Sequence, residues 1–285
     1  DWSSDVCSSD LQERYGQVDG RYEVVDNKVS YEYQSSDKVF FPRMGDYTQN
    51  RPALYKEWMK RWGSNRNQPN SFDNLNFLVR YQLGWMYWRY FMWNFAGRQN
   101  GEQGFFSWDL SSGHWLTGIE PLDEARLYEM DELPESAKEH EARNRYFMLP
   151  FLFGLFGLLF HFQKRPSEAL GLLALFIITG VGIIIYSNQP PNEPRERDYV
   201  LAGSFFTYAI WVGMGAIAIY DLLRDRLSLS SNVAGVIGVL AVMAAPLLMG
   251  FQNFDDHSRR HHTGARDYAS NFLESCEENA IIFTY

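Results

Sequence analysis

The stretch that decides the fold is LGLLALFIITGVGIIIYS, residues 170–187, which contains no charged side chain. A bilayer core of about 30 Å is crossed by about 20 helical residues. Three further apolar runs lie close by, and the two shortest runs reach this length with their flanking residues. The sequence therefore predicts an α-helical transmembrane protein with four spans. The predicted spans are residues 147–162, 170–187, 200–220 and 233–251.

Short links join the four predicted spans, so we expect an up-and-down antiparallel arrangement with both outer ends on one side. The positive-inside rule favours cytoplasmic first and third links. These links carry Lys164, Arg165, Arg224 and Arg226, whereas the second link carries Arg195 and Arg197. The arginines that flank the outer ends weigh the other way; they are Arg143, Arg145, Arg259 and Arg260. We expect the outer ends, and the regions attached to them, to be extracytoplasmic.

The region before the spans, residues 12–146, is of mixed α/β character. Short β-like runs at 22–25, 29–33 and 38–41 are separated by turn residues, and Asp26-Asn27 predicts a hairpin turn. We therefore predict an extracytoplasmic loop region with some strand structure.

An aromatic helix is predicted at residues 75–95. Arg80 and Arg89 would each cost about 2.5–3.5 kcal/mol at the centre of a membrane span. Trp and Tyr favour the headgroup level, so we interpret this helix as lying at the membrane interface. Its stripe of Tyr81, Trp85, Arg89 and Trp93 would place a guanidinium over aromatic rings. The alternative is an ordinary buried aromatic helix.

The second link, NQPPNEPRERDY at residues 188–199, bears two arginines next to a predicted span. Its prolines would hold it extended near the membrane surface. Arg195 and Arg197 each offer a planar donor fork, which suits a phosphate or pyrophosphate group. The alternative is a solvated charge cluster that pairs with itself.

Residues 252–285 predict the start of a truncated extracytoplasmic α/β domain, with an amphipathic helix over 263–278 and a strand at 280–283. His257 and His261 lie beside carboxylates, but adjacent arginines would repel a cation, so we predict no metal site. Both ends are expected to be cuts in a longer protein. Residues 1–11, DWSSDVCSSDL, resemble a translated sequencing adapter and are excluded from fold reasoning as an artefact.

Composition and missing motifs exclude several functions. A net charge of −9 without a basic stripe gives no case for nucleic-acid binding. The sequence lacks GxxxxGK[ST], GxGxxG and GxSxG motifs, so nucleotide or serine hydrolysis is unsupported. Polar groups are scarce within the spans, which argues against an ion-coupled transporter.

The most distinctive sequence block is QLGWMYWRYFMWNFAGRQN at residues 82–100. Further blocks are FPRM at 41–44, YKEW at 55–58, PRERDY at 194–199, AGSF at 202–205, ARDYA at 265–269 and NAIIFT at 279–284. These blocks resemble a bacterial multispanning family, formerly a domain of unknown function and now grouped with the protein O-mannosyltransferases as glycosyltransferase family 117.

The resemblance implies a glycosyltransferase C type enzyme in the bacterial inner membrane, of which this chain is a middle fragment. Such an enzyme would transfer a sugar, with mannose expected, from a polyprenyl-phosphate donor to Ser or Thr of exported proteins. In such an enzyme an acidic residue of the first extracytoplasmic loop acts as general base on the acceptor hydroxyl; nothing here matches that loop, so no catalytic residue is assigned.

The donor-binding residues implied are Arg195 and Arg197, with Arg80, Arg89 and Arg98 on a loop helix that could cover the active site. The expected partners are the lipid bilayer, the lipid-linked sugar and exported acceptor proteins. No cofactor is expected within the chain, and its metal dependence is left open. The alternative function is a non-catalytic envelope membrane protein that binds periplasmic polypeptide or glycan.

Overall fold

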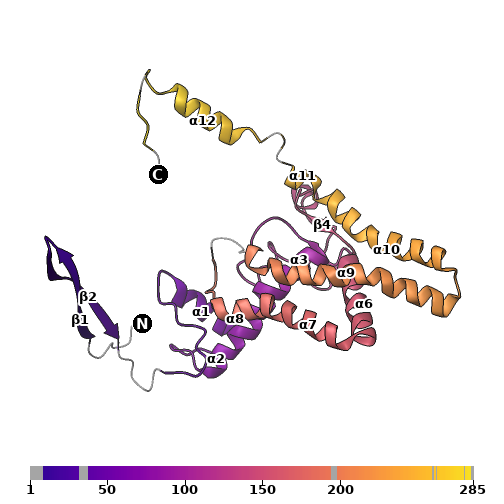
Figure 1. Cartoon of the computed structure of the whole chain (residues 1–285), viewed down its shortest axis with the longest axis horizontal. Coiled ribbons are helices and arrows are strands. Elements are labelled where there is room, and N and C mark those ends of the chain that lie inside the picture. The colour runs from indigo at the N-terminus through magenta and orange to yellow at the C-terminus, as the bar shows by residue number, and fades with distance from the viewer. Residues whose placement is uncertain are drawn as a thin grey trace.

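The structure is a computed structural model of the 285-residue chain, and it describes residues 9–31, 38–193, 198–258, 260, 262–278 and 280–283. Figure 1 shows an N-terminal hairpin, short helices and strands at 38–146 (the loop region), long helices at 149–252 (the helix bundle) and a tail. The hairpin is β1 (Ser9–Val18) and β2 (Arg21–Tyr31). The loop region holds α1 (Arg51–Lys60), α2 (Ser71–Asn76), the π-helical η2 (Phe77–Trp88), α3 (Arg89–Phe95), β3 (Gly97–Arg98), α4 (Glu120–Glu124), α5 (Glu135–Lys138) and β4 (Asn144–Arg145). The helix bundle and tail hold α6 (Leu149–Lys164), α7 (Pro166–Ile177), the π-helical η3 (Ile178–Gly182), α8 (Ile183–Ser187), α9 (Asp198–Leu227), α10 (Ser231–Gln252), α11 (Phe254–His257) and α12 (Gly264–Glu274).

The hairpin turns at a different place from the one predicted. β1 and β2 are antiparallel, and Asp19 and Gly20 connect them with φ angles of 49° and 81°. Two positive φ angles define the turn that matches the twist of paired strands, and Asp-Gly is one of its preferred sequences. The turn predicted at Asp26-Asn27 is therefore wrong, because those residues lie inside β2. The run at 38–41 also forms no strand, and β1 begins within the stretch excluded as an artefact.

The aromatic helix is confirmed, and it starts earlier than predicted. α2, η2 and α3 follow one another without a break from residue 71 to residue 95. Asn70 caps the start, because its side chain accepts a hydrogen bond from Asp73 N at 3.0 Å while Asp73 Oδ2 accepts one from Asn70 N at 3.1 Å. This reciprocal capping box supplies two of the hydrogen bonds that a helix start lacks.

Within the described residues, the helix bundle has three helices that are long and apolar enough to cross a membrane, as expected of a helical membrane protein. They are Pro166–Ser187, Tyr199–Leu227 and Ser231–Gln252. They correspond to the second, third and fourth predicted spans. The first predicted span is α6, an apolar helix of 16 residues, or about 24 Å, which is shorter than the bilayer core.

Glycines bring α6 and α9 into close contact. A Cβ added to Gly157 would overlap the carbonyl oxygen of Trp211 and lie 2.8 Å from the nitrogen of Gly215. A Cβ on Gly215 would lie 2.8 Å from the carbonyl oxygen of Phe153. Small residues at such crossings let two backbones approach, which is the usual packing mode of membrane helices. The α6–α9 pair is therefore the tightest crossing described in the bundle.

The loop region and the end of α10 lie on the same side of the bundle, as predicted from the short links. Gln252 accepts a hydrogen bond from Arg145 N at 2.7 Å and donates one to Arg145 O at 3.0 Å. Asn253 Nδ2 donates to the Tyr146 hydroxyl at 2.6 Å. At the opposite end, Lys164 and Asp221 form an ion pair of 2.8 Å. These contacts fix which ends of the helices face the loop region.

The tail contains the predicted amphipathic helix but not the predicted strand. α12 carries Tyr268 and Phe272 on one face, with ring centroids 6.5 Å apart. Residues 280–283 are irregular and exposed, since 81% of Ile281 and 89% of Phe283 are accessible. A strand needs a partner for its backbone groups. No strand pairs with these residues in the part of the chain that the structure describes.

Candidate functional site

Arg89 lies at the centre of the predicted aromatic stripe. Its side chain is only 3% exposed, and its guanidinium carbon lies 4.7 Å from the Trp85 ring centroid and 4.9 Å from that of Trp93. Its Nε donates to Trp85 O at 3.0 Å, and its Nη1 donates to Gly113 O at 2.9 Å. The prediction of a guanidinium between aromatic rings is confirmed. Arg89 thereby joins α3 to the loop that contains Gly113.

Three of the five predicted arginines lie among the described residues, and the structure brings two of these together. Arg98 lies near Arg89, because its guanidinium is 5.9 Å from the Trp93 ring and its Nε donates to Ala142 O at 2.9 Å. Arg80 is exposed on η2. Arg195 and Arg197 lie outside the described residues. Whether any of these side chains contacts a donor phosphate stays a prediction.

The start of the second link is bound by the loop region. Gln82 Nε2 donates to Asn188 Oδ1 at 3.0 Å and to Gln189 O at 3.3 Å. Tyr81 donates its hydroxyl to Pro190 O at 3.2 Å. This segment therefore leaves the end of α8 along a path set by η2.

A second set of contacts holds the link a little further along. Arg51 donates to Pro191 O and forms an ion pair with Glu193 at 3.6 Å. Gln103 Nε2 donates to Glu193 O at 3.1 Å. Glu193, the last described residue before Arg195, is therefore held by contacts with both Arg51 and Gln103. A small pocket lies beside it, lined by Tyr81, Trp85, Met86, Arg89, Gln103, Gly104, Phe105, Gln189, Asn192 and Glu193.

Arg43 connects the loop region to the end of α8. It is not among the functional residues predicted from the sequence. Its Nε donates to Gln82 Oε1 at 2.9 Å, and its Nη2 donates to Ile185 O at 2.8 Å. The last carbonyl groups of a helix lack partners within the helix and carry partial negative charge. Burial lowers the pKa of Arg43. The sequence offers one signal for the Arg43–Gln82 contact, which is the polar amide of Gln82 within a run of aromatic residues.

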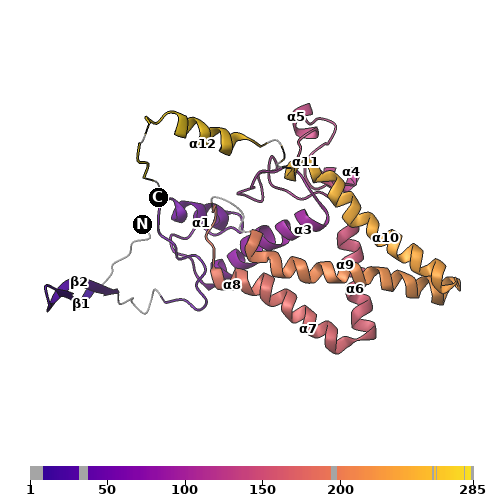
Figure 2. The same cartoon turned by 45° about the horizontal axis from the view of Figure 1, so that its top comes forward.

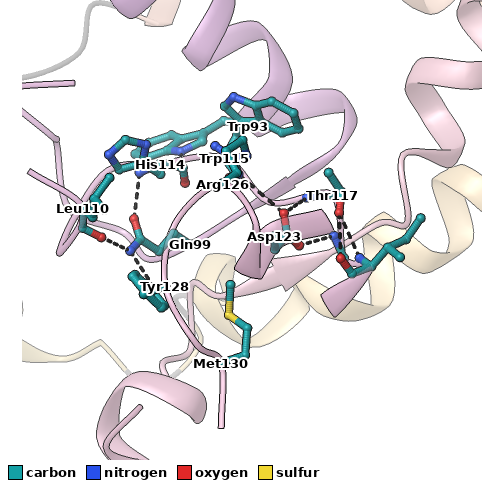
Figure 3. A network of polar contacts seen from close by, with 12 residues as sticks. Trp93, Gln99, Leu110, His114, Trp115, Thr117, Asp123, Arg126, Tyr128 and Met130 are labelled. Carbon is teal, nitrogen blue, oxygen red and sulfur yellow. Dashed lines mark hydrogen bonds and ion pairs between the residues drawn. The ribbon is translucent and has the colours of Figure 1, made fainter. Parts of the chain in front are cut away.

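Asp123 is buried and serves the backbone of a turn. Its Oδ1 accepts from Thr117 N at 2.7 Å and its Oδ2 accepts from Gly118 N at 2.9 Å (Figure 3). Arg126 lies 3.4 Å from the same carboxylate, with its guanidinium 4.0 Å from the Trp115 ring centroid. A carboxylate committed to these donors stabilises the turn and is poorly placed to act as a general base.

Gln99 and His114 form the other half of this network (Figure 3). Gln99 accepts from His114 N at 2.8 Å and donates from Nε2 to Leu110 O at 2.8 Å and to the Tyr128 hydroxyl at 2.7 Å. Burial lowers the pKa of His114 to about 4. Its ring is therefore neutral at ordinary pH. The network holds the loop around 110 against the segment around 128.

An open groove of about 710 Å³ lies along this network. Most of its lining residues carry polar groups, but apolar atoms form the larger part of the lining surface. The lining residues are Gln99, Asn100, Glu102, Leu110, Ser111, Ser112, Tyr128, Leu133, Pro134, Ser136, Ala137, His140 and Arg143. Among the described residues, no group of three or more His, Cys, Asp or Glu side chains has the geometry of a metal site.

Comparison with known proteins gives a single partial match. The model of a family of unknown function (DUF8416) matches residues 2–79, which include the hairpin, α1, α2 and the first residues of η2. No curated protein and no solved structure matches the chain.

Proposed function

We propose that this chain is part of a membrane glycosyltransferase that transfers a sugar from a polyprenyl-phosphate donor to Ser or Thr hydroxyls of exported proteins. Mannose is the first sugar to test. The proposal follows the resemblance of residues 82–100 and 194–199 to the protein O-mannosyltransferase-like family. It also places the loop region on the extracytoplasmic side of a bacterial inner membrane and counts α6 as a fourth span.

The observation that carries the proposal is the fixed path of the second link. Gln82, Tyr81 and Arg51 bind the link between Asn188 and Glu193, immediately before Arg195. The same end of the bundle carries the loop region. A lipid-linked phosphate is presented at the membrane surface, and an arginine fork binds its oxygens with two parallel hydrogen bonds. The proposal assigns the binding of the donor phosphate to Arg195 and Arg197, which lie outside the described residues.

The test is sugar transfer by the complete protein carrying Arg197→Ala. We expect transfer to fall at least about tenfold, because a charge-assisted hydrogen bond contributes about 1.5–3 kcal/mol. The measurement is radiolabel moved from polyprenyl-phosphate mannose to protein and released by β-elimination.

The matched control is Arg224→Ala, in the last turn of α9 at the opposite end of the bundle. It should leave transfer unchanged, and both variants should insert into membranes normally. Normal transfer by an inserted Arg197→Ala protein would show that the link is only an anchor.

A second candidate function is a non-catalytic envelope membrane protein that binds periplasmic polypeptide or glycan. One observation favours this candidate. The buried carboxylates of Asp73 and Asp123 are both used in structural hydrogen bonds, so neither is well placed to act as a general base. An acidic pair in an upstream extracytoplasmic loop of the complete protein would support the enzyme. Its absence, together with no transfer from any polyprenyl-phosphate sugar, would favour the binding protein.

A further inference from the structure

The groove beside Gln99 has features of a binding site that the proposed function does not use. Its volume of about 710 Å³ falls in the range of ligand sites, about 300–1,000 Å³. Gln99 is only 2% exposed, and its hydrogen bonds to Leu110 O and the Tyr128 hydroxyl join two walls of the groove (Figure 3). The walls are therefore held in place by a buried amide.

Two side chains of the groove, Tyr128 and His140, each accept a hydrogen bond from a neighbour and therefore have a hydrogen left to donate. The Tyr128 hydroxyl accepts from Gln99 Nε2 at 2.7 Å, so its own hydrogen is left to donate to another acceptor. His140 Nδ1 accepts from Ala142 N at 3.1 Å, so a neutral His140 ring carries its hydrogen on Nε2. Both residues line the groove.

Arg143 is the third donor, and it is poorly satisfied. Its Nη2 lies 3.2 Å from the Met130 sulfur, which is a weak acceptor, and its Nη1 lies 3.5 Å from Gln99 O. Its buried Nε has no hydrogen-bond partner. No carboxylate of the described residues forms an ion pair with it. Because Nε is buried, contact with a ligand in the groove falls to the two Nη nitrogens, and these gain free energy from a better acceptor oxygen.

The rest of the lining adds acceptors and apolar surface. Glu102 is exposed and contributes a carboxylate, while Leu110, Leu133 and Pro134 contribute carbon surface. A ligand that suits this mixture has groups that both donate and accept, together with C–H faces. Sugar hydroxyls and sugar rings have these properties.

The charge of the surroundings argues against an anionic ligand. The segment 120–141, which forms one wall, carries many more Asp and Glu side chains than Lys and Arg. Such a field repels anions and lowers their rate of association. Arg143 and Glu102 within the groove offset each other, so the negative field comes from the surrounding segment, and it disfavours an anion without disfavouring a neutral ligand.

We propose that this groove binds a neutral oligosaccharide, with Tyr128, His140 and Arg143 donating to its hydroxyl oxygens and Glu102 accepting from a hydroxyl. The site is independent of the proposed transfer reaction, since none of these residues belongs to the second link.

The test is binding of a neutral trisaccharide, maltotriose, to the purified chain in a detergent without a sugar headgroup, measured by saturation-transfer NMR and titration. Tyr128→Phe keeps the ring and removes the hydroxyl, both the hydrogen it could donate and the oxygen that accepts from Gln99 Nε2, while Gln99 Nε2 keeps its bond to Leu110 O. We expect this variant to weaken binding about fivefold, the effect of one hydrogen bond. Tyr47→Phe, an exposed tyrosine outside the groove, is the matched control and should bind as the parent does.

Two further ligands decide between the alternatives. Trigalacturonate has the same size but carries carboxylates, and a Ser- and Thr-rich peptide represents a polypeptide ligand. We expect both to bind more weakly than maltotriose. Tighter binding of either one, no maltotriose binding up to its solubility limit, or equal affinity of the Tyr128→Phe and parent proteins would overturn the proposal.

Discussion

The loop region and the helix bundle hold together in different ways. In the loop region, large aromatic side chains such as Trp58 and Phe77 are fully buried, and Arg89 is stacked between two tryptophans. In the bundle, the closest crossing occurs where Gly157 and Gly215 remove side chains altogether. Figure 2 shows the two regions joined along α3, which lies against the long helices.

The difference follows from the solvent that surrounds each region, which is water for the loop region and lipid for the bundle. Burying aromatic surface from water stabilises a fold by about 25 cal/mol per Å². Apolar helices gain no such free energy from one another in lipid, so they depend on close contact and on interhelical hydrogen bonds. The two regions should therefore be sensitive to different changes. Added side-chain volume should destabilise the bundle, whereas lost volume or lost polar contacts should destabilise the loop region.

The largest effect is expected from Gly157→Ala in the bundle. The added methyl group would overlap backbone atoms of Trp211, which cannot rotate away as a side chain can. We expect a loss of more than about 4 kcal/mol, beyond the usual cost of overpacking, or loss of the folded bundle. The measurement is the stability of the bundle by thermal unfolding of the protein in nanodiscs.

The control for this prediction is Gly213→Ala on α9. A Cβ at Gly213 would meet nothing within 4 Å, so this variant should be as stable as the parent or slightly more stable. Equal stability of the two variants would contradict the proposed glycine crossing.

The next largest effect is expected from Arg89→Met in the loop region. The change removes two hydrogen bonds to backbone carbonyls and two contacts with tryptophan rings. We expect the free energy of unfolding of the loop region to fall by about 3 kcal/mol. Hydrogen exchange of its amides is the measurement. Arg80→Met, on the exposed side of the same helix, should change it by less than about 0.5 kcal/mol. Similar losses for both would show that the stack is not specific.

A smaller effect is expected from pH, through His114. Burial lowers the pKa of His114 to about 4, with Arg126 and Arg89 acting in the same direction and Asp109 opposing it. The unfolded chain therefore binds a proton at higher pH than the folded chain does. Stability is fully present above about pH 6.5 and has fallen by about 2 kcal/mol when the pH reaches about 5. His114→Gln should flatten this slope in loop-region hydrogen exchange, whereas His257→Gln, at an exposed position, should leave it unchanged. A slope that survives His114→Gln would assign it to another group.

The smallest effect is expected from Asp123→Asn. One carboxylate oxygen becomes an NH₂ group, which cannot accept from Thr117 N or Gly118 N, so one buried N–H loses its partner. We expect a loss of about 1–2 kcal/mol in the loop region and none in the bundle. Measuring both regions by hydrogen exchange in one sample checks whether they are energetically separate. A parallel loss in the bundle would show that they unfold as one unit.

Local patterns predicted the parts of the fold that depend on neighbours in sequence. The second, third and fourth apolar runs form long helices, and the 75–95 pattern forms a helix with Arg89 between Trp85 and Trp93. The turn predicted at Asp26-Asn27 is wrong, because Asp19-Gly20 is the stronger turn signal and forms the turn. The strand at 280–283 failed because a strand depends on a partner that the pattern of one segment does not provide.

The sequence by itself determined the apolar helices, their antiparallel order and the aromatic stripe. These depend on hydropathy, link length and helical spacing, all of which are properties of short segments. Only the tertiary structure decided that Arg43 binds the carbonyl groups at the end of α8, that Gln82 holds the second link and that Gln99 joins the two walls of the groove. Each of these contacts pairs a buried polar group with an acceptor distant in sequence. Such pairing is set by how the chain packs, because a buried donor takes whichever acceptor the fold brings within reach.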